Sequence, residues 1–177
     1  PHVLPAQKQK SAILGYSYFT TIKRNELKNI RAYLNINFPE SKVRDTLRII
    51  EKLQQVDMKD KDTNIINTLN INLYDYIEVN LLDPAKDYTI TPVNHTSDKQ
   101  KVDTIKGNNW GWSVLTKTDK NTTSLILKVT AYMPDSTAEL DNRIIPIRIK
   151  LEKNMFRKLW TVLLDDPKYF LVVILVP

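Results

Sequence analysis

Apolar and polar residues alternate along much of the chain, most clearly near its middle. Trp110 and Trp112 stand two residues apart, and after a polar stretch Leu125, Leu127 and Val129 repeat that spacing. Side chains two apart on a strand share one face, so each run predicts a strand with one apolar face. The polar stretch between the runs predicts that they pair as a β-hairpin. We therefore expect this hairpin to form the centre of the core.

The same alternation recurs in other parts of the chain. The further predicted strands cover residues 15–22, 69–73, 77–81, 88–91 and 145–151. Polar stretches at residues 94–101 and 133–142 predict loops. About six or seven short strands separated by turns are typical of two packed sheets. The sequence thus predicts a mainly β fold, an antiparallel Ig-like β-sandwich.

One part of the chain follows the helical period instead. After Asn25, a candidate helix N-cap, three apolar residues recur at helical spacing: Leu27, Ile30 and Leu34. A second run with the same period extends from Ser41 to residue 55. Residues 25–55 are therefore predicted to form a short two-helix insertion in the sandwich.

These patterns divide the chain into three parts. Residues 1–15 contain Pro1 and Pro5 ahead of any sustained periodicity, which predicts a linker. Residues 16–152 form the predicted sandwich domain. Residues 153–177 are predicted to begin with an amphipathic helix and to continue into the start of a membrane anchor.

The segment 153–177 combines basic, aromatic and apolar residues in a way typical of a membrane interface. Its last run, from Phe170 to Pro177, is uncharged. A spanning helix needs about 20 apolar residues, so this run is at most half of one, and its Val and Ile content also fits a buried last strand. The predicted membrane-interface residues are Lys153, Arg157, Lys158, Trp160, Lys168, Tyr169 and Phe170. Their positive charges predict a membrane-associated domain on the cytoplasmic face.

Composition excludes several kinds of chemistry and favours an anionic partner. The 177 residues contain no cysteine and two histidines, so we expect no disulfide, no metal site and no catalytic triad. No motif indicates a catalytic residue, a cofactor or a small-molecule substrate. The net charge of +6 favours an anionic partner. Because basic residues concentrate before the apolar run, the predicted partner is membrane lipid and not nucleic acid.

Trp110 and Trp112 are the candidate binding residues outside the C-terminal segment. Aromatic faces stack on sugars and on bases, so an exposed pair would form a binding platform. Apolar neighbours on the following predicted strand favour core packing instead. Both interpretations stay open from the sequence.

The order of the strand residues resembles a known kind of module. The segments that carry the resemblance are Ile22–Leu27, Tyr76–Leu81, Tyr88–Ile90, Lys99–Val102, Trp110–Val114, Leu125–Val129 and Ile147–Ile149. Over residues 20–177 the arrangement is similar to the juxtamembrane β-sandwich module at the C-terminal end of many uncharacterised bacterial signalling and conflict-type membrane proteins. The stretch 39–62 and the turn after Val114 depart from that pattern. The resemblance implies a β-sandwich beside a membrane and implies no particular site residue.

The leading functional hypothesis is a non-enzymatic, membrane-proximal interaction module. It would couple a protein partner, an upstream domain or a second copy of the chain to a membrane, within a bacterial signalling or anti-phage defence protein. The alternative hypothesis is an exported ligand-binding or adhesion domain that uses the Trp pair or the loop at residues 133–142.

Overall fold

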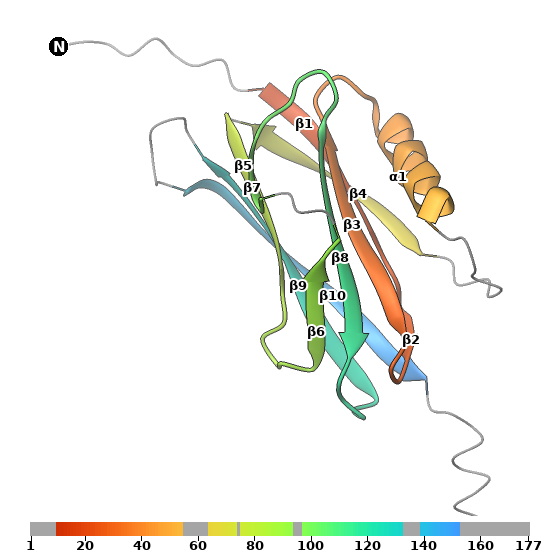
Figure 1. Cartoon of the computed structure of the whole chain (residues 1–177). Coiled ribbons are helices and arrows are strands. Elements are labelled where there is room, and N and C mark those ends of the chain that lie inside the picture. Colours follow the sequence, from red (N-terminus) through yellow and green to blue (C-terminus); the bar gives the residue numbers. More distant parts are fainter. Residues whose placement is uncertain (1–9, 55–63, 74, 94–96, 133–138, 153–177) are drawn as a thin grey trace, which may run out of the picture.

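Two β-sheets pack face to face, and one helix lies on the outer side of one of them (Figure 1). The computed structural model describes residues 10–54, 64–73, 75–93, 97–132 and 139–152. Sheet A has the spatial order β4 (Ile65–Leu73), β1 (Lys10–Tyr18), β3 (Leu27–Asn35), β8 (Asn108–Thr116) and β6 (Tyr88–Pro92). Sheet B has the order β2 (Thr21–Lys23), β10 (Glu139–Glu152), β9 (Thr122–Tyr132), β5 (Tyr76–Leu82) and β7 (Lys99–Lys101). The prediction of a mainly β fold is confirmed.

Neighbouring strands are antiparallel throughout sheet A. Sheet B is mixed, because the short strand β2 runs parallel to β10 while its other pairs are antiparallel. The helix α1 (Glu40–Gln54) follows β3 and packs on β1, β3 and β4. The outer side of sheet B carries no helix in the described part of the chain (Figure 1).

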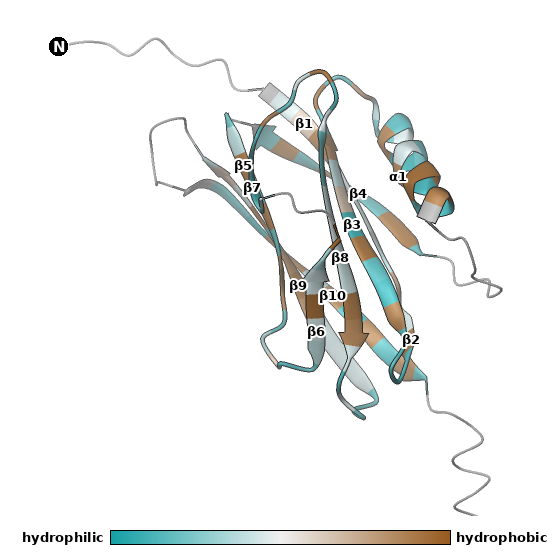
Figure 2. Ribbon diagram, in the orientation of Figure 1, coloured by the Kyte–Doolittle hydropathy of each residue, from teal (hydrophilic) through white to brown (hydrophobic). Residues whose placement is uncertain are grey.

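The core lies between the sheets and is built from one apolar face of each strand. In β5, Ile77, Val79 and Leu81 are buried and alternate with partly exposed residues. Leu125 and Leu127 do the same in β9, and Figure 2 shows the alternation as brown and teal along the strands. Each such side chain contributes about 1.5–3 kcal/mol on burial. The strands predicted at residues 69–73, 77–81, 88–91 and 145–151 are confirmed.

β8 and β9 do not form the predicted hairpin, because they belong to different sheets. β8 pairs with β3 and β6, whereas β9 pairs with β5 and β10. Trp110 and Trp112 therefore enter the core from sheet A and Leu125 and Leu127 from sheet B. Packed sheets stand about 10 Å apart, and the link at residues 117–121 is long enough to cross that distance. Alternation predicted the buried faces correctly but not the neighbouring strand.

The first of the two predicted helices is wrong, since residues 27–35 form strand β3. Ile30 and Leu34 are four residues apart, a spacing that places two side chains on one face of a helix and equally on one face of a strand. The third apolar residue of the pattern, Leu27, is 55% exposed. Asn25 has a φ of 59° and lies in the turn between β2 and β3, so it is not a helix cap.

The second predicted helix is confirmed as α1, which begins directly after Pro39 and ends at Gln54. The expected two-helix insertion is therefore a single helix preceded by a strand. The predicted linker at residues 1–15 also changes, because β1 begins at Lys10 and residues 10–15 belong to sheet A. Residues 1–9 lie outside the described residues.

Two stretches predicted as loops contain strand structure. The polar residues 99–101 form β7 at the edge of sheet B, and β10 already begins at Glu139. Edge strands need little apolar content because one side pairs with a neighbour and the other faces solvent. The predicted amphipathic helix and apolar tail at residues 153–177 lie outside the described residues.

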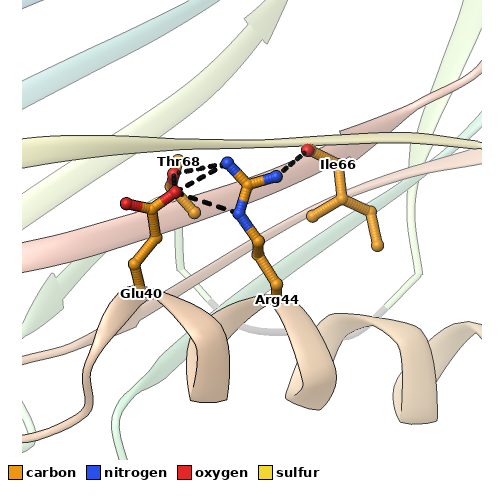
Figure 3. Close-up of polar contacts among 4 residues, drawn as sticks. All are labelled: Glu40, Arg44, Ile66 and Thr68. Carbon is orange, nitrogen blue, oxygen red and sulfur yellow. Dashed lines mark hydrogen bonds and ion pairs between the residues drawn. The ribbon is translucent and has the colours of Figure 1, made fainter.

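Helix α1 closes the outer face of sheet A over β1, β3 and β4. Val43 and Leu47 on its inner side are fully buried and pack with Tyr33 of β3. Near the start of the helix, the Arg44 guanidinium donates to the Ile66 carbonyl at 2.8 Å and to Thr68 Oγ1 at 3.1 Å (Figure 3). These contacts join the helix to the edge strand β4.

Glu40 completes this network at the start of the helix. Its Oε1 accepts from Thr68 Oγ1 at 2.6 Å and from Arg44 Nη2 at 2.7 Å (Figure 3). The hydrogen bond from Thr68, followed by those from Arg44, lowers the pKa of Glu40 from its ordinary value of 4.5. A charged Glu40 therefore favours the folded protein.

We expect the Glu40→Gln variant to be less stable than the wild type above pH 4.5, and the difference to shrink at lower pH. The carboxylate has a lower pKa in the folded than in the unfolded state, so its contribution is present above 4.5 and is lost as pH falls through the folded value. Urea unfolding of both proteins between pH 2.5 and 6 measures this. A difference that stayed constant over that range would contradict an ionic role for Glu40.

Candidate interaction surface

The described residues show no arrangement typical of a catalytic or metal centre. Within these residues, no group of three or more His, Cys, Asp or Glu side chains could hold a metal ion. Both histidines, His2 and His95, lie outside the described residues. None of the helical structure in the described ranges is long and apolar enough to span a membrane, since α1 has 15 residues with both charged and apolar positions.

Trp110 and Trp112 lie in the core with exposed fractions of 1% and 4%. The Trp110 Nε1 donates to the Asp98 carbonyl at 2.9 Å, which satisfies the buried indole nitrogen. Neither ring has an open face on which a sugar or a base could stack. The structure therefore places this pair in the packing of the sandwich and leaves no platform there.

The other predicted site residues lie in the segment 153–177, which is outside the described residues. They are Lys153, Arg157, Lys158, Trp160, Lys168, Tyr169 and Phe170. Strand β10 ends at Glu152, directly before this segment. Their membrane-interface role stays a prediction.

No described helix covers the outer face of sheet B, and we call this surface the open face. Its members are the side chains that alternate with the buried ones in β2, β10, β9, β5 and β7. Six of them are basic: Lys23, Lys99, Lys101, Lys128, Arg148 and Lys150. Two are acidic, Glu78 and Glu152. The described side chains of the open face therefore carry a net positive charge.

An apolar row crosses the middle of the open face. Leu82 of β5 pairs with Ile126 of β9, which pairs in turn with Pro146 of β10. Leu82 is 42% exposed, and Ile144, two residues from Pro146 on the same face, is 66% exposed. Solvent-exposed apolar side chains that form a continuous row indicate a contact surface more strongly than scattered ones do.

Aromatic residues and a lysine form a cluster at one edge of the open face. Lys99 Nζ lies 4.1 Å from the ring centre of Tyr132 and 5.7 Å from that of Tyr76. The Tyr132 hydroxyl donates to Glu78 Oε2 at 2.5 Å, and Asn80 Nδ2 donates to Glu78 Oε1 at 2.8 Å. The hydrogen bond from Tyr132 is the main cause of a lowered pKa of Glu78.

This cluster holds amphipathic and charged groups in fixed positions. Lysine over an aromatic face is stabilised by the ring quadrupole, by about 0.5–1 kcal/mol at an exposed site. Tyr76 and Tyr132 lie side by side on neighbouring strands, since the two residues are register partners in β5 and β9. The open face thus combines cations, tyrosines and apolar side chains.

Sequence reasoning missed the open face because it depends on strand pairing. Lys99 lies in a stretch predicted as a loop, and β7 joins sheet B only through its pairing with β5. The available signal was the alternation itself, which places Tyr76 and Glu78 opposite the buried Ile77 and Val79. It could not show that Tyr132, more than 50 residues away along the chain, lies beside them.

The chain was also compared with models of protein families, with curated proteins and with solved structures, and none of the three comparisons found a match. The resemblance to the juxtamembrane module stays a prediction.

Proposed function

We propose that the protein is a non-enzymatic, membrane-proximal interaction module that rests the open face of sheet B on an anionic membrane surface. The observation that carries the proposal is the contrast between the two sheets. Helix α1 covers the outer side of β1, β3 and β4 in sheet A, whereas no described helix covers the outer side of sheet B, which is basic and crossed by an apolar row. Each basic residue near an anionic bilayer contributes about 1 kcal/mol of binding free energy.

The proposal includes an Ig-like arrangement of the sandwich. In an Ig constant-type fold, the seven strands A to G form the sheets A-B-E-D and C-F-G. The strands β1, β3, β8 and β6 of sheet A take the order A-B-E-D when β1, β3, β5, β6, β8, β9 and β10 are lettered A to G. The strands β5, β9 and β10 of sheet B then take the order C-F-G. The remaining strands β2, β4 and β7 are additions at sheet edges.

The position of the open face supports a role beside a cytoplasmic leaflet. Anionic lipids concentrate there, and the basic residues predicted at the membrane interface follow β10 directly in the sequence. Two of the cations of the open face, Arg148 and Lys150, lie near the end of strand β10, before that segment. Such a module would hold an upstream domain or a protein partner of a bacterial signalling or defence protein close to the bilayer.

Single-cysteine labelling of the full chain tests which face meets the membrane. The chain has no cysteine, so Ile144→Cys on the open face and Leu53→Cys on α1 each provide one site for an environment-sensitive fluorophore. The two positions are matched in exposure, at 66% and 73%. We expect phosphatidylcholine vesicles that contain phosphatidylglycerol to shift the emission of the label at residue 144 to the blue. The label at residue 53 should not respond.

Charge reversal tests the electrostatic part of the proposal. The triple change of Lys99, Lys101 and Arg148 to Glu turns the open face from basic to acidic, and we expect it to abolish the emission shift at residue 144. The matched control changes Lys42, Arg48 and Lys52 on α1 to Glu, and should keep the shift because α1 lies on the other side of the molecule. Equal responses at residues 144 and 53, or the same response from both triple variants, would rule out the proposal.

The Ig-like strand order also supports the second candidate, an exported adhesion or ligand-binding domain, because many cell-surface domains share this architecture. The burial of Trp110 and Trp112 removes one of the two binding regions expected for it. Protease digestion of intact cells that express the full-length protein distinguishes the candidates. Degradation of the domain would support export, and protection would support the cytoplasmic face.

A further inference from the structure

Each of the two sheets ends in two edge strands, and three of these four edges carry features that oppose pairing with another chain. An edge strand presents a row of unpaired backbone N–H and C=O groups, which natural proteins protect by short length, lysine or proline. β2 and β7 are three residues long and contain Lys23, Lys99 and Lys101. β6 has five residues and contains Pro92. These three edges are therefore poor partners for a further strand.

The fourth edge strand, β4, has none of these features. Its nine residues contain no charged residue and no proline. All nine pair with β1 without a register shift, so no bulge turns the edge away from a partner. At about 3.4 Å per residue, the strand extends over about 30 Å. β4 is thus the long, uncharged edge of the molecule.

The outer side of the β4 backbone has one contact in the described part of the chain. The Arg44 guanidinium donates to the Ile66 carbonyl near the start of the strand. Beyond that point, no described residue outside β1 forms a hydrogen bond with the β4 backbone. Arg44 also pairs with Glu40, so the contact brings no net charge to this edge. Residues 67–73 therefore present an edge that another strand can join.

The side chains of this edge match a second copy of the same strand. Leu69 and Ile71 pack on the side of the core, whereas Asn70 and Asn72 are exposed. Antiparallel pairing about a two-fold axis at Asn70 sets Leu69 of each copy opposite Ile71 of the other, on one face of the sheet. On the other face, it sets Asn70 opposite Asn70 and Thr68 opposite Asn72. Apolar side chains then meet apolar ones, and polar side chains meet polar ones.

We propose that two copies of the chain associate through antiparallel pairing of β4 about Asn70, which joins the two five-stranded sheets A into one continuous sheet. Added main-chain hydrogen bonds supply the affinity, as in other cases of strand addition. A second copy suits this edge because like charges directly opposite each other destabilise a strand pair, and β4 has none. The lysines of β2 and β7 would repel their own copies.

The joined sheet has room for both helices. Helix α1 packs on β1 and on its neighbours β3 and β4. In the dimer the two β1 strands lie three strand spacings apart, about 14 Å. Packed helices stand about 8–10 Å apart, so two helices over the β1 strands do not clash.

The two-fold axis of this pairing is perpendicular to sheet A. Both copies of sheet B therefore lie on the same side of the joined sheet, and their two open faces point in the same direction. The pairing leaves the open faces uncovered, and it does not depend on the proposed membrane role.

Sedimentation equilibrium of the full chain tests the pairing. The mass of the wild type is expected to rise with concentration from that of one chain, 20.6 kDa, to that of two. Asn70→Lys combined with Asn72→Lys sets like charges opposite each other in the dimer, and this double variant should stay monomeric over the same range. The matched control is Thr89→Lys with Thr91→Lys, two exposed positions of β6 at the other edge of sheet A, and it should dimerise like the wild type.

Two results of this experiment would overturn the proposal. One is a wild type with the mass of a single chain at every concentration. The other is dimerisation of both lysine variants alike, because the contact would then lie outside β4.

Disulfide cross-linking gives an answer even if the Asn70→Lys, Asn72→Lys variant does not fold. The chain has no cysteine, so Asn70→Cys provides one thiol per copy. Residues directly opposite each other in an antiparallel pair have Cα atoms about 4.5–5.5 Å apart, a distance that a disulfide spans. Mild oxidation is expected to give a covalent dimer of Asn70→Cys and not of Thr91→Cys. A covalent dimer of Thr91→Cys alone, or of neither variant, would refute the pairing at β4.

Discussion

Replacement of Trp110 by alanine is expected to lower the free energy of unfolding by about 3–5 kcal/mol, as for other large aromatic residues in cores. The side chain is 1% exposed and fills the space between the sheets opposite the apolar face of sheet B. The cavity left by the indole cannot close without moving strands that are paired on both sides, since β8 lies between β3 and β6. Urea unfolding followed by far-ultraviolet circular dichroism measures the change.

Trp110→Phe separates packing from hydrogen bonding at the same position. It keeps an aromatic ring and loses the bond from Nε1 to the Asp98 carbonyl. The net worth of such a bond is about 1 kcal/mol, so this variant should lie between the wild type and Trp110→Ala. If Trp110→Ala were as stable as the wild type, the indole would not be a core residue.

Valine at position 15 is expected to lower the free energy of unfolding by about 3 kcal/mol, at the upper end for an overpacked site. A Cβ at Gly15 would lie 2.6 Å from Val43 Cγ1 and 2.7 Å from Leu47 Cδ1. Both side chains are fully buried under α1, and the β-branched Val43 has little rotamer freedom. The helix must therefore move away from sheet A.

A double-mutant cycle with Val43→Ala tests whether the loss arises at this contact. Removal of the Val43 methyl groups makes space for the new side chain, so the two changes together should cost at least about 1 kcal/mol less than the sum of the single changes. Strictly additive effects would place the cause of the destabilisation elsewhere than the helix contact.

The alternating strands were predictable because one face of each is buried and the other is not. Ile77, Val79 and Leu81 in β5 show this pattern directly, and the same is true of the residues at 145–151. Helix α1 was predictable for a related reason, since Val43 and Leu47 are buried against the sheet while the opposite side meets solvent. A strand or helix with one buried face and one solvent-exposed face shows a periodic pattern of apolar residues in the sequence.

Strand β3 was not predictable, because both of its faces are buried. Ile30 and Leu34 face the core, while Arg31, Tyr33 and Asn35 are buried on the side of α1. A polar residue on the outer face of a strand usually indicates that this face meets solvent. The outer face of β3 is instead covered by helix α1. Because polar residues occupy buried positions of β3, its apolar residues stand at a spacing that resembles the helical period.

The open face depends on pairings between distant segments, which residue patterns do not contain. The cations of the open face come from four strands, β2, β7, β9 and β10, and each occupies an ordinary polar position in its own strand. Trp110 and Trp112 were candidate binding residues because exposed aromatic faces can stack on sugars and bases. Their burial shows that their contribution is to stability.

The parallel pairing of β2 with β10 has a mechanical consequence. Thr21, Ile22 and Lys23 are register partners of Lys150, Leu151 and Glu152, so an early segment of the chain is fastened beside the last described strand. A tension applied between residues 10 and 152 pulls two parallel strands in opposite directions along their axes. Their hydrogen bonds then bear the load together in shear, instead of opening one after another as at the end of a hairpin. Tension between residues 10 and 152 would therefore load the pairs of β1 with β3 and β4 as well as this short β2–β10 pairing.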